Sequence, residues 1–233
     1  MGLVAREYIT DRKKRRERIK HLTEFIESCL KLIEVKGELP QGYAMRFVKC
    51  RKELEALIRI DKSEGDVLYF TYEYFSEDKN PGNVGNLIPE GDFYEDAAKF
   101  HKEICDILNE VSNEKVNKRV AVSAPRGHAK SAYLSNSFPA HQVVFEKRKY
   151  ILILSETDSA SKKFVEWIAN QLKFNEKLRR DFGELLSPNQ RENERDNQEA
   201  FITTTGILVE ASSIGKQLRG KRHMSYRPDL VIC

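Results

Sequence analysis

The residues best suited to do chemistry lie together near the middle of the chain. A short apolar run (residues 120–123) leads into a turn with Pro125 and Gly127, and Lys130 and Ser131 follow. A turn between a strand and a helix directs several backbone N–H groups at one point, and the helix dipole adds positive charge there. This layout predicts a phosphate-binding loop, in which Lys130 contacts the β- and γ-phosphates and the Ser131 hydroxyl binds Mg²⁺.

The loop departs from the usual G-x-x-x-x-G-K-[ST] pattern, because Ala124 and Ala129 occupy the two glycine positions. Alanine is penalised where φ must be positive, so we expect Gly127 to adopt the most demanding dihedral angle. The alternative is an ordinary strand, turn and helix in which the Lys-Ser pair is incidental.

The segments around this loop predict an α/β fold. Residues 149–154 are almost continuously apolar, as in a strand that is buried on both faces of a parallel sheet, and residues 158–172 have a helical apolar face. Residues 200–203 and 207–211 read as a hairpin or a kinked strand, and residues 228–233 as a further strand. This alternation favours a right-handed, largely parallel sheet with flanking helices.

The N-terminal part predicts a helical hairpin. Apolar residues recur at helical spacing within residues 19–33 and 43–58, on either side of a glycine-containing break. The basic run at residues 12–18 is either a contact for a phosphate backbone or the solvated start of a helix. The aromatic segment at residues 67–75 is either a strand or a peptide laid over a surface, and we expect its rings to be buried.

We therefore predict three parts: a helical hairpin appendage at residues 1–60, a connecting region at 61–91 and a P-loop domain at 92–233. The chain of 233 residues is long enough for a real core, and its net charge of +4 permits a nucleic-acid partner without requiring one. No apolar stretch is long enough to span a membrane, there is no export signal, and the four cysteines form no C-x-x-C pair. These features predict a cytoplasmic protein without a membrane partner.

The loop sequence Ala-Pro-Arg-Gly-His-Ala-Lys-Ser at residues 124–131 resembles the P-loop variant of the large terminase subunits of tailed bacteriophages. Residues 100–103, 151–157, 217–220 and 227–233 carry the same resemblance. It implies a P-loop NTPase-type domain with a parallel sheet and flanking helices. This domain would bind ATP and Mg²⁺, with adenine contacts within residues 93–101. The backbone of residues 124–129 would form the phosphate cradle, and the implied cofactor-binding residues are Ala124, Pro125, Arg126, Gly127, His128, Ala129, Lys130 and Ser131.

The resemblance also implies roles and partners. Lys130 and Arg126 would be catalytic, with Arg126 stabilising charge on the γ-phosphate, and the alternative for Arg126 is a structural or DNA-facing residue. Ser131 would bind Mg²⁺. Arg219 would contact phosphate or couple hydrolysis to movement, and its alternative is a place in a solvated loop. The implied substrate of the motor is double-stranded DNA, and the implied partners are the procapsid portal, the small terminase subunit and further copies of the same chain. Assembly would take place in the cytoplasm of the host cell.

The second ATPase motif is expected to be incomplete. Residues 228–233 have the form of the strand at whose tip family members carry two acidic residues, and these would follow Cys233. Asp229 lies at the strand's entrance and cannot replace them. We therefore expect the front part of a longer protein, which binds ATP weakly and hydrolyses it poorly.

Two further functions remain open from the sequence. One is another P-loop nucleic-acid translocase, such as a helicase, whose distinguishing motifs would lie beyond residue 233. The other is a non-catalytic module that joins intact partners through its helical hairpin.

Overall fold

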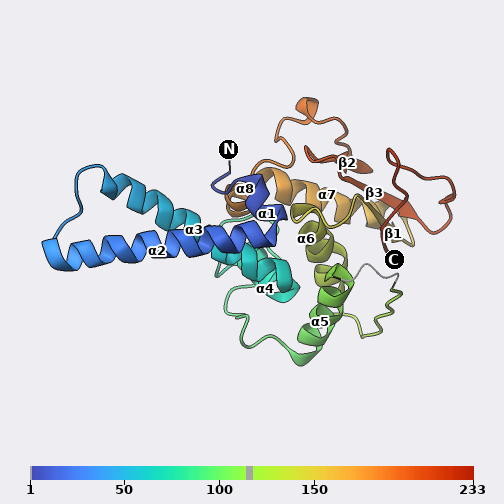
Figure 1. Ribbon diagram of the computed structural model, residues 1–233. Coiled ribbons are helices and arrows are strands. Elements are labelled where there is room, and N and C mark those ends of the chain that lie inside the picture. The colour runs from blue at the N-terminus through green and yellow to red at the C-terminus, as the bar shows by residue number, and fades with distance from the viewer. Residues whose placement is uncertain (1, 114–117) are drawn as a thin grey trace.

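The computed structural model describes residues 2–113 and 118–233. Its four-stranded mixed sheet has the order β2-β3-β1-β4 and lies beside helices, while a long helical hairpin extends away from the body (Figure 1). The strands are β1 (Tyr150–Ser155), β2 (Ala200–Ile202), β3 (Leu208–Ser213) and β4 (Leu230–Ile232). β1 pairs in parallel with β3 and β4, and β2 pairs antiparallel with β3. The predicted α/β class and the β2–β3 hairpin are therefore confirmed.

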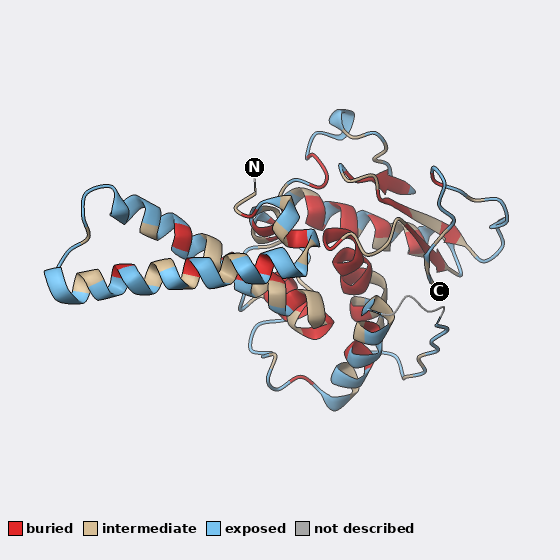
Figure 2. Cartoon of the chain, viewed as in Figure 1, coloured by how far each residue is buried: buried red, intermediate tan, exposed pale blue. Residues whose placement is uncertain are grey.

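β1 is the centre of the sheet, and its first five residues are buried, as the continuous apolar run predicts (Figure 2). The crossover to β3 includes α7 (Asp158–Phe174), whose Val165, Ile168 and Leu172 join the buried cluster. Thr157 caps α7 by accepting a hydrogen bond from the Ala160 N–H at 3.3 Å. A short helix, α8 (Glu176–Phe182), and one 3₁₀ turn (Gln190–Glu192) complete the crossover.

The predicted helical hairpin is confirmed as α2 (Arg12–Lys36) and α3 (Tyr43–Gly65), preceded by the short α1 (Arg6–Thr10). Asp11 starts α2 by accepting hydrogen bonds from the N–H groups of Lys13 and Lys14. Gly37, at φ 77°, ends it. α3 runs to Gly65, into the expected connecting region. None of the helices in the described ranges combines the length and apolar character needed to cross a membrane.

The aromatic segment at residues 67–75 is the α-helix α4 (Val67–Phe75), so the prediction of a strand or surface peptide is wrong. Asp66 caps the helix by accepting a hydrogen bond from the Tyr69 N–H at 2.8 Å. All its residues except Tyr69 are buried, which confirms the expected burial of the rings. A helix enclosed on all sides has no polar face, and its sequence therefore carries no helical periodicity.

The predicted strand at residues 120–123 is also wrong, because these residues adopt no regular secondary structure. A strand requires a neighbour for its ladder hydrogen bonds, and β4 pairs only with β1. Val122 instead packs against the buried cluster that Leu230 and Ile232 of β4 also contact. The P-loop type of sheet thus remains a prediction.

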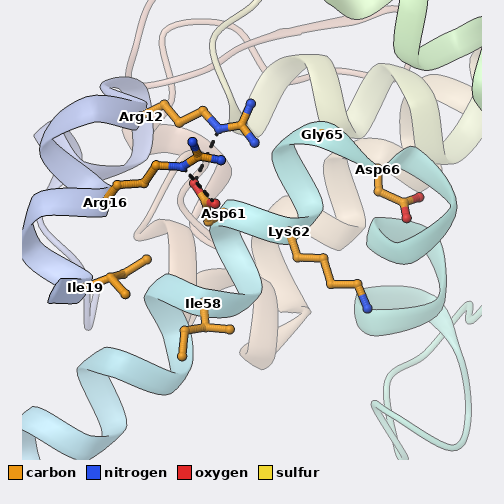
Figure 3. A pocket seen from close by; sticks show the side chains of 8 residues that line it. All are labelled: Arg12, Arg16, Ile19, Ile58, Asp61, Lys62, Gly65 and Asp66. Carbon is orange, nitrogen blue, oxygen red and sulfur yellow. Dashed lines mark hydrogen bonds and ion pairs between the residues drawn. The ribbon is translucent and has the colours of Figure 1, made fainter. Parts of the chain in front are cut away.

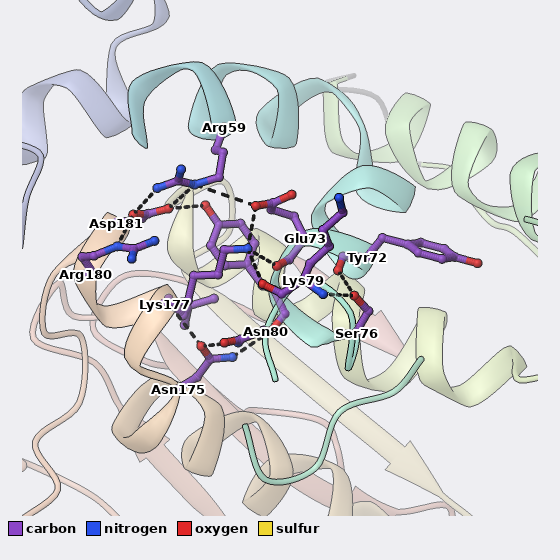
Figure 4. A network of polar contacts seen from close by, with 12 residues as sticks. Arg59, Tyr72, Glu73, Ser76, Lys79, Asn80, Asn175, Lys177, Arg180 and Asp181 are labelled. Atoms are coloured by element: carbon purple, nitrogen blue, oxygen red, sulfur yellow. Dashed lines mark hydrogen bonds and ion pairs between the residues drawn. The ribbon is translucent and has the colours of Figure 1, made fainter. Parts of the chain in front are cut away.

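A buried polar network attaches the hairpin to the body (Figure 4). Arg59 of α3 and Tyr74 of α4 both donate hydrogen bonds to the carboxylate of Asp181 in α8. Lys177 of α8 pairs with Glu73 of α4 at 2.6 Å. Because three helices meet in this network, the base of the hairpin is fixed relative to the body.

Candidate functional site

Residues 124–131, the candidate phosphate loop, form an exposed turn at the start of a helix. Gly127 has φ 86°, as the sequence predicts, and Ala129 has φ 50°. The helical run starts at Lys130 and continues to the end of α6 (Phe138–Val144). The loop therefore lies at a helix N-terminus, where free backbone N–H groups and the helix dipole favour an anion.

Lys130 curls back over the loop. Its ammonium donates hydrogen bonds to the carbonyl oxygens of Ala124 and Pro125, the latter at 2.9 Å. Ser131 is exposed beside it, in the first helical turn. A phosphate in the loop could accept hydrogen bonds from the same ammonium, and among the described residues no hydrogen bond is made by the Ser131 hydroxyl.

The helix after the loop begins with a π-helical segment at Ala132–Ser137, in which the Phe138 N–H bonds to the Tyr133 carbonyl. π-Helical turns are rare in proteins, and those that do occur are often found at functional sites. Ser137 shares a 2.6 Å hydrogen bond with Thr71 of α4, and His141 of α6 contacts the Ser63 carbonyl of α3 at 3.0 Å. The helix that begins at the loop is thus bonded directly to the helices at the base of the hairpin.

A cleft of about 240 Å³ opens beside the loop. One wall comes from α5 (Lys99–Asn113), which lies close to the loop because His101 contacts the His128 carbonyl at 3.2 Å. The His101 and Tyr133 rings lie 4.8 Å apart. The aromatic and charged side chains that line the cleft include those of Asp92, Phe93, Asp96, His101 and Tyr133.

These cleft residues combine ring faces with hydrogen-bonding groups. Tyr133 is fully buried, and burial raises the pKa of its hydroxyl, with a smaller contribution from the neighbouring Tyr72. Asp92 and Asp96 supply carboxylate acceptors. A flat heterocycle with an amino group could therefore stack against the rings and donate to a carboxylate.

Within the described part of the chain, the remaining predicted residues form no hydrogen bond or ion pair with the Lys130 ammonium. Arg126 is exposed on the turn, and Arg219 lies in the exposed loop after β3. No hydrogen bond or ion pair within the described ranges connects Arg219 to the candidate phosphate loop. Asp229 lies at the entrance to β4, as predicted, where its carboxylate accepts hydrogen bonds from the backbone N–H groups of Lys149 and Tyr150.

The sequence predicts a site at the loop and at residues 93–101, and it gives no sign that Tyr133 lines the same cleft. Tyr133 follows Lys130 by three positions, and no sequence pattern there distinguishes it from an ordinary helical residue. Within residues 2–113 and 118–233, no three His, Cys, Asp or Glu side chains converge in a way that could hold a metal ion.

Comparison of the chain with protein-family models, with curated proteins and with solved structures found no match.

Proposed function

We propose that this chain is the nucleotide-binding part of a large terminase subunit, the ATPase that drives double-stranded DNA into a viral procapsid. The observation that carries the proposal is the candidate phosphate loop. It combines positive φ at Gly127 and Ala129 with Lys130 and Ser131 at a helix N-terminus. That arrangement presents backbone donors, an ammonium and a hydroxyl to one point, which suits a triphosphate with its Mg²⁺.

Each loop residue has a role in this proposal. The backbone of residues 124–129 surrounds the phosphates, Lys130 exchanges its bonds to the loop carbonyls for phosphate oxygens, and Ser131 holds Mg²⁺. Bound Mg²⁺ would neutralise part of the phosphate charge. Arg126, exposed on the turn, stabilises charge at the terminal phosphate. In the cleft, the adenine ring stacks near Phe93 and His101 and donates its amino group to Asp92 or Asp96.

The portal, the small terminase subunit and further copies of this chain are the proposed partners in the cytoplasm of the host.

Titration calorimetry with Mg·ATP tests nucleotide binding by the full chain. We expect the wild type to bind and Lys130→Ala to bind at least roughly tenfold more weakly, because one charge-assisted contact is worth about 1.5–3 kcal/mol. Lys31→Ala, on the exposed face of α2, removes the same charge elsewhere and serves as the control. Equal affinities of the wild type and Lys130→Ala would refute the proposal.

A second candidate function, assembly without catalysis, is favoured by the outer part of the hairpin. Leu30, Val35, Met45 and Val48 there are between 46% and 85% exposed. Large apolar side chains that are exposed on an extended element are often found at protein interfaces. Co-purification with intact subunits that does not change with Mg·ATP or with Lys130→Ala would support this candidate over the first.

A further inference from the structure

The positive charge of the chain is concentrated at the start of α2. Residues 12–20 contain seven Lys or Arg and one Glu, a net charge of +6, whereas the whole chain has +4. The other residues together are therefore net −2. A charge asymmetry of this size within nine residues predicts an anionic partner for that surface more strongly than the overall composition does.

The contacts separate these cations into two groups. Lys14 pairs with Glu7, Arg18 with Glu53, and the fully buried Arg15 with Asp61 and Glu64, so these three stabilise the hairpin. The second group consists of Arg12, Lys13, Arg16 and Lys20, which face outward and line an open depression of about 500 Å³. Among the described residues that line it, Glu17 is the only one with a carboxylate, and Lys20 also approaches Glu24 at 4.0 Å.

Asp61 orients two members of this outward group (Figure 3). Arg12 and Arg16 reach it from α2 at 3.5 Å and 3.4 Å, and Arg15 contacts it from the buried side at 3.0 Å. One carboxylate therefore serves three guanidinium groups. The side chains of Arg12 and Arg16 remain 49% and 61% exposed, with donors available to a second anion.

The spacing suits a polymer better than a single anion. Arg12, Arg16 and Lys20 follow one another at intervals of four residues, a rise of about 6 Å each along one face of the helix. A DNA strand carries one phosphate per roughly 3.4 Å of duplex axis. A duplex can therefore contact all three cations at once, whereas one phosphate group cannot.

We propose that this basic surface, formed by Arg12, Lys13, Arg16 and Lys20, binds the phosphate backbone of double-stranded DNA. The charge and the spacing of these residues indicate an anionic polymer. The choice of a DNA duplex among such polymers rests on the proposed function. The surface lies at the base of the hairpin. There, α3 is bonded to the helix that starts at the candidate phosphate loop, through His141 and Ser63.

Fluorescence anisotropy with a short labelled duplex, without nucleotide, tests the proposal on the full chain. Lys13→Glu/Lys20→Glu should bind roughly tenfold more weakly, and the slope of log affinity against log salt should fall by about 2, one for each lost phosphate contact. Lys31→Glu/Lys36→Glu changes the net charge equally on the same helix and should match the wild type. Thermal melting shows that both variants are folded.

Equal affinity of the two double variants for the duplex would overturn the proposal. So would binding to phosphatidylserine vesicles without binding to the duplex, because the surface would then recognise lipid headgroups. Lys130→Ala should bind the duplex like the wild type. A failure of nucleotide binding at the loop and a failure of DNA binding at the basic surface are therefore distinguishable.

Discussion

Arg59 of α3 holds the carboxylate of Asp181 in α8 with two parallel hydrogen bonds of 3.0 Å each. The Asp181 side chain is fully buried and that of Arg59 is 18% exposed. The pair connects residues 122 positions apart in the sequence and fixes the base of the hairpin to the body. A bidentate pair of this kind is specific in geometry and costly to break on one side only.

Replacing Asp181 with Asn should lower the free energy of unfolding by about 3 kcal/mol, because it leaves the mostly buried Arg59 with only the more distant carboxylate of Glu73, at 3.9 Å, as counter-charge. Urea denaturation gives this value. Glu55→Gln, which breaks the exposed Arg51–Glu55 pair, should cost less than about 1 kcal/mol. Similar losses in both variants would show that the Arg59–Asp181 pair is not what holds the hairpin.

The candidate phosphate loop depends on the dihedral angle of Gly127. A Cβ at Gly127 or at Gly215 would meet no atom within 4 Å, but only Gly127 has positive φ. Gly127→Ala should therefore cost about 1 kcal/mol of stability, whereas Gly215→Ala should be neutral or slightly stabilising. Gly127→Ala should also weaken Mg·ATP binding. Equal melting temperatures for the two variants would contradict this account of the turn.

His141 should make the protein sensitive to acid. Burial, with a smaller effect of Lys147, lowers its pKa from 6.5 to about 3, and both ring nitrogens are hydrogen-bonded: Nε2 donates to the Ser63 carbonyl, and Nδ1 accepts from the Gln142 amide. Below pH 6.5 the unfolded chain binds a proton that the folded chain does not. Stability should therefore fall with decreasing pH, by up to about 1.4 kcal/mol per pH unit, until pH approaches 3.

Urea denaturation between pH 7 and pH 5 measures this effect. In His141→Gln the free energy of unfolding should fall less steeply with decreasing pH than in the wild type, because the variant lacks the proton that His141 takes up on unfolding. If the plots of unfolding free energy against pH are parallel for the two proteins across that range, the fold does not lower the pKa of His141.

The elements with a clear apolar period were predictable from the sequence. The hairpin helices and α7 each expose one face, and their apolar residues recur at helical spacing. β1 is buried on both faces, and its residues are almost continuously apolar. α4 was mistaken for a strand or surface peptide because burial on every side removes the period, and its aromatic residues favour strands in other settings.

The candidate site was only partly predictable for a related reason. Lys130, Ser131 and Gly127 follow from local order, because a turn at a helix N-terminus is a local structure. The contacts of His101 with the His128 carbonyl and with the Tyr133 ring join segments that are separated in sequence. Residues 120–123 likewise form no strand because no strand of the sheet pairs with them. Pairing with a distant strand cannot be read from the local sequence.

Hydrogen–deuterium exchange with and without Mg·ATP tests the central claim most directly, because it locates the bound nucleotide on the chain. Backbone amides of residues 126–132 should exchange more slowly when the nucleotide is present, since they would donate hydrogen bonds to phosphate oxygens, and Lys130→Ala should abolish the difference. Unchanged exchange in these residues at a saturating nucleotide concentration, with protection elsewhere, would contradict the assignment of the loop.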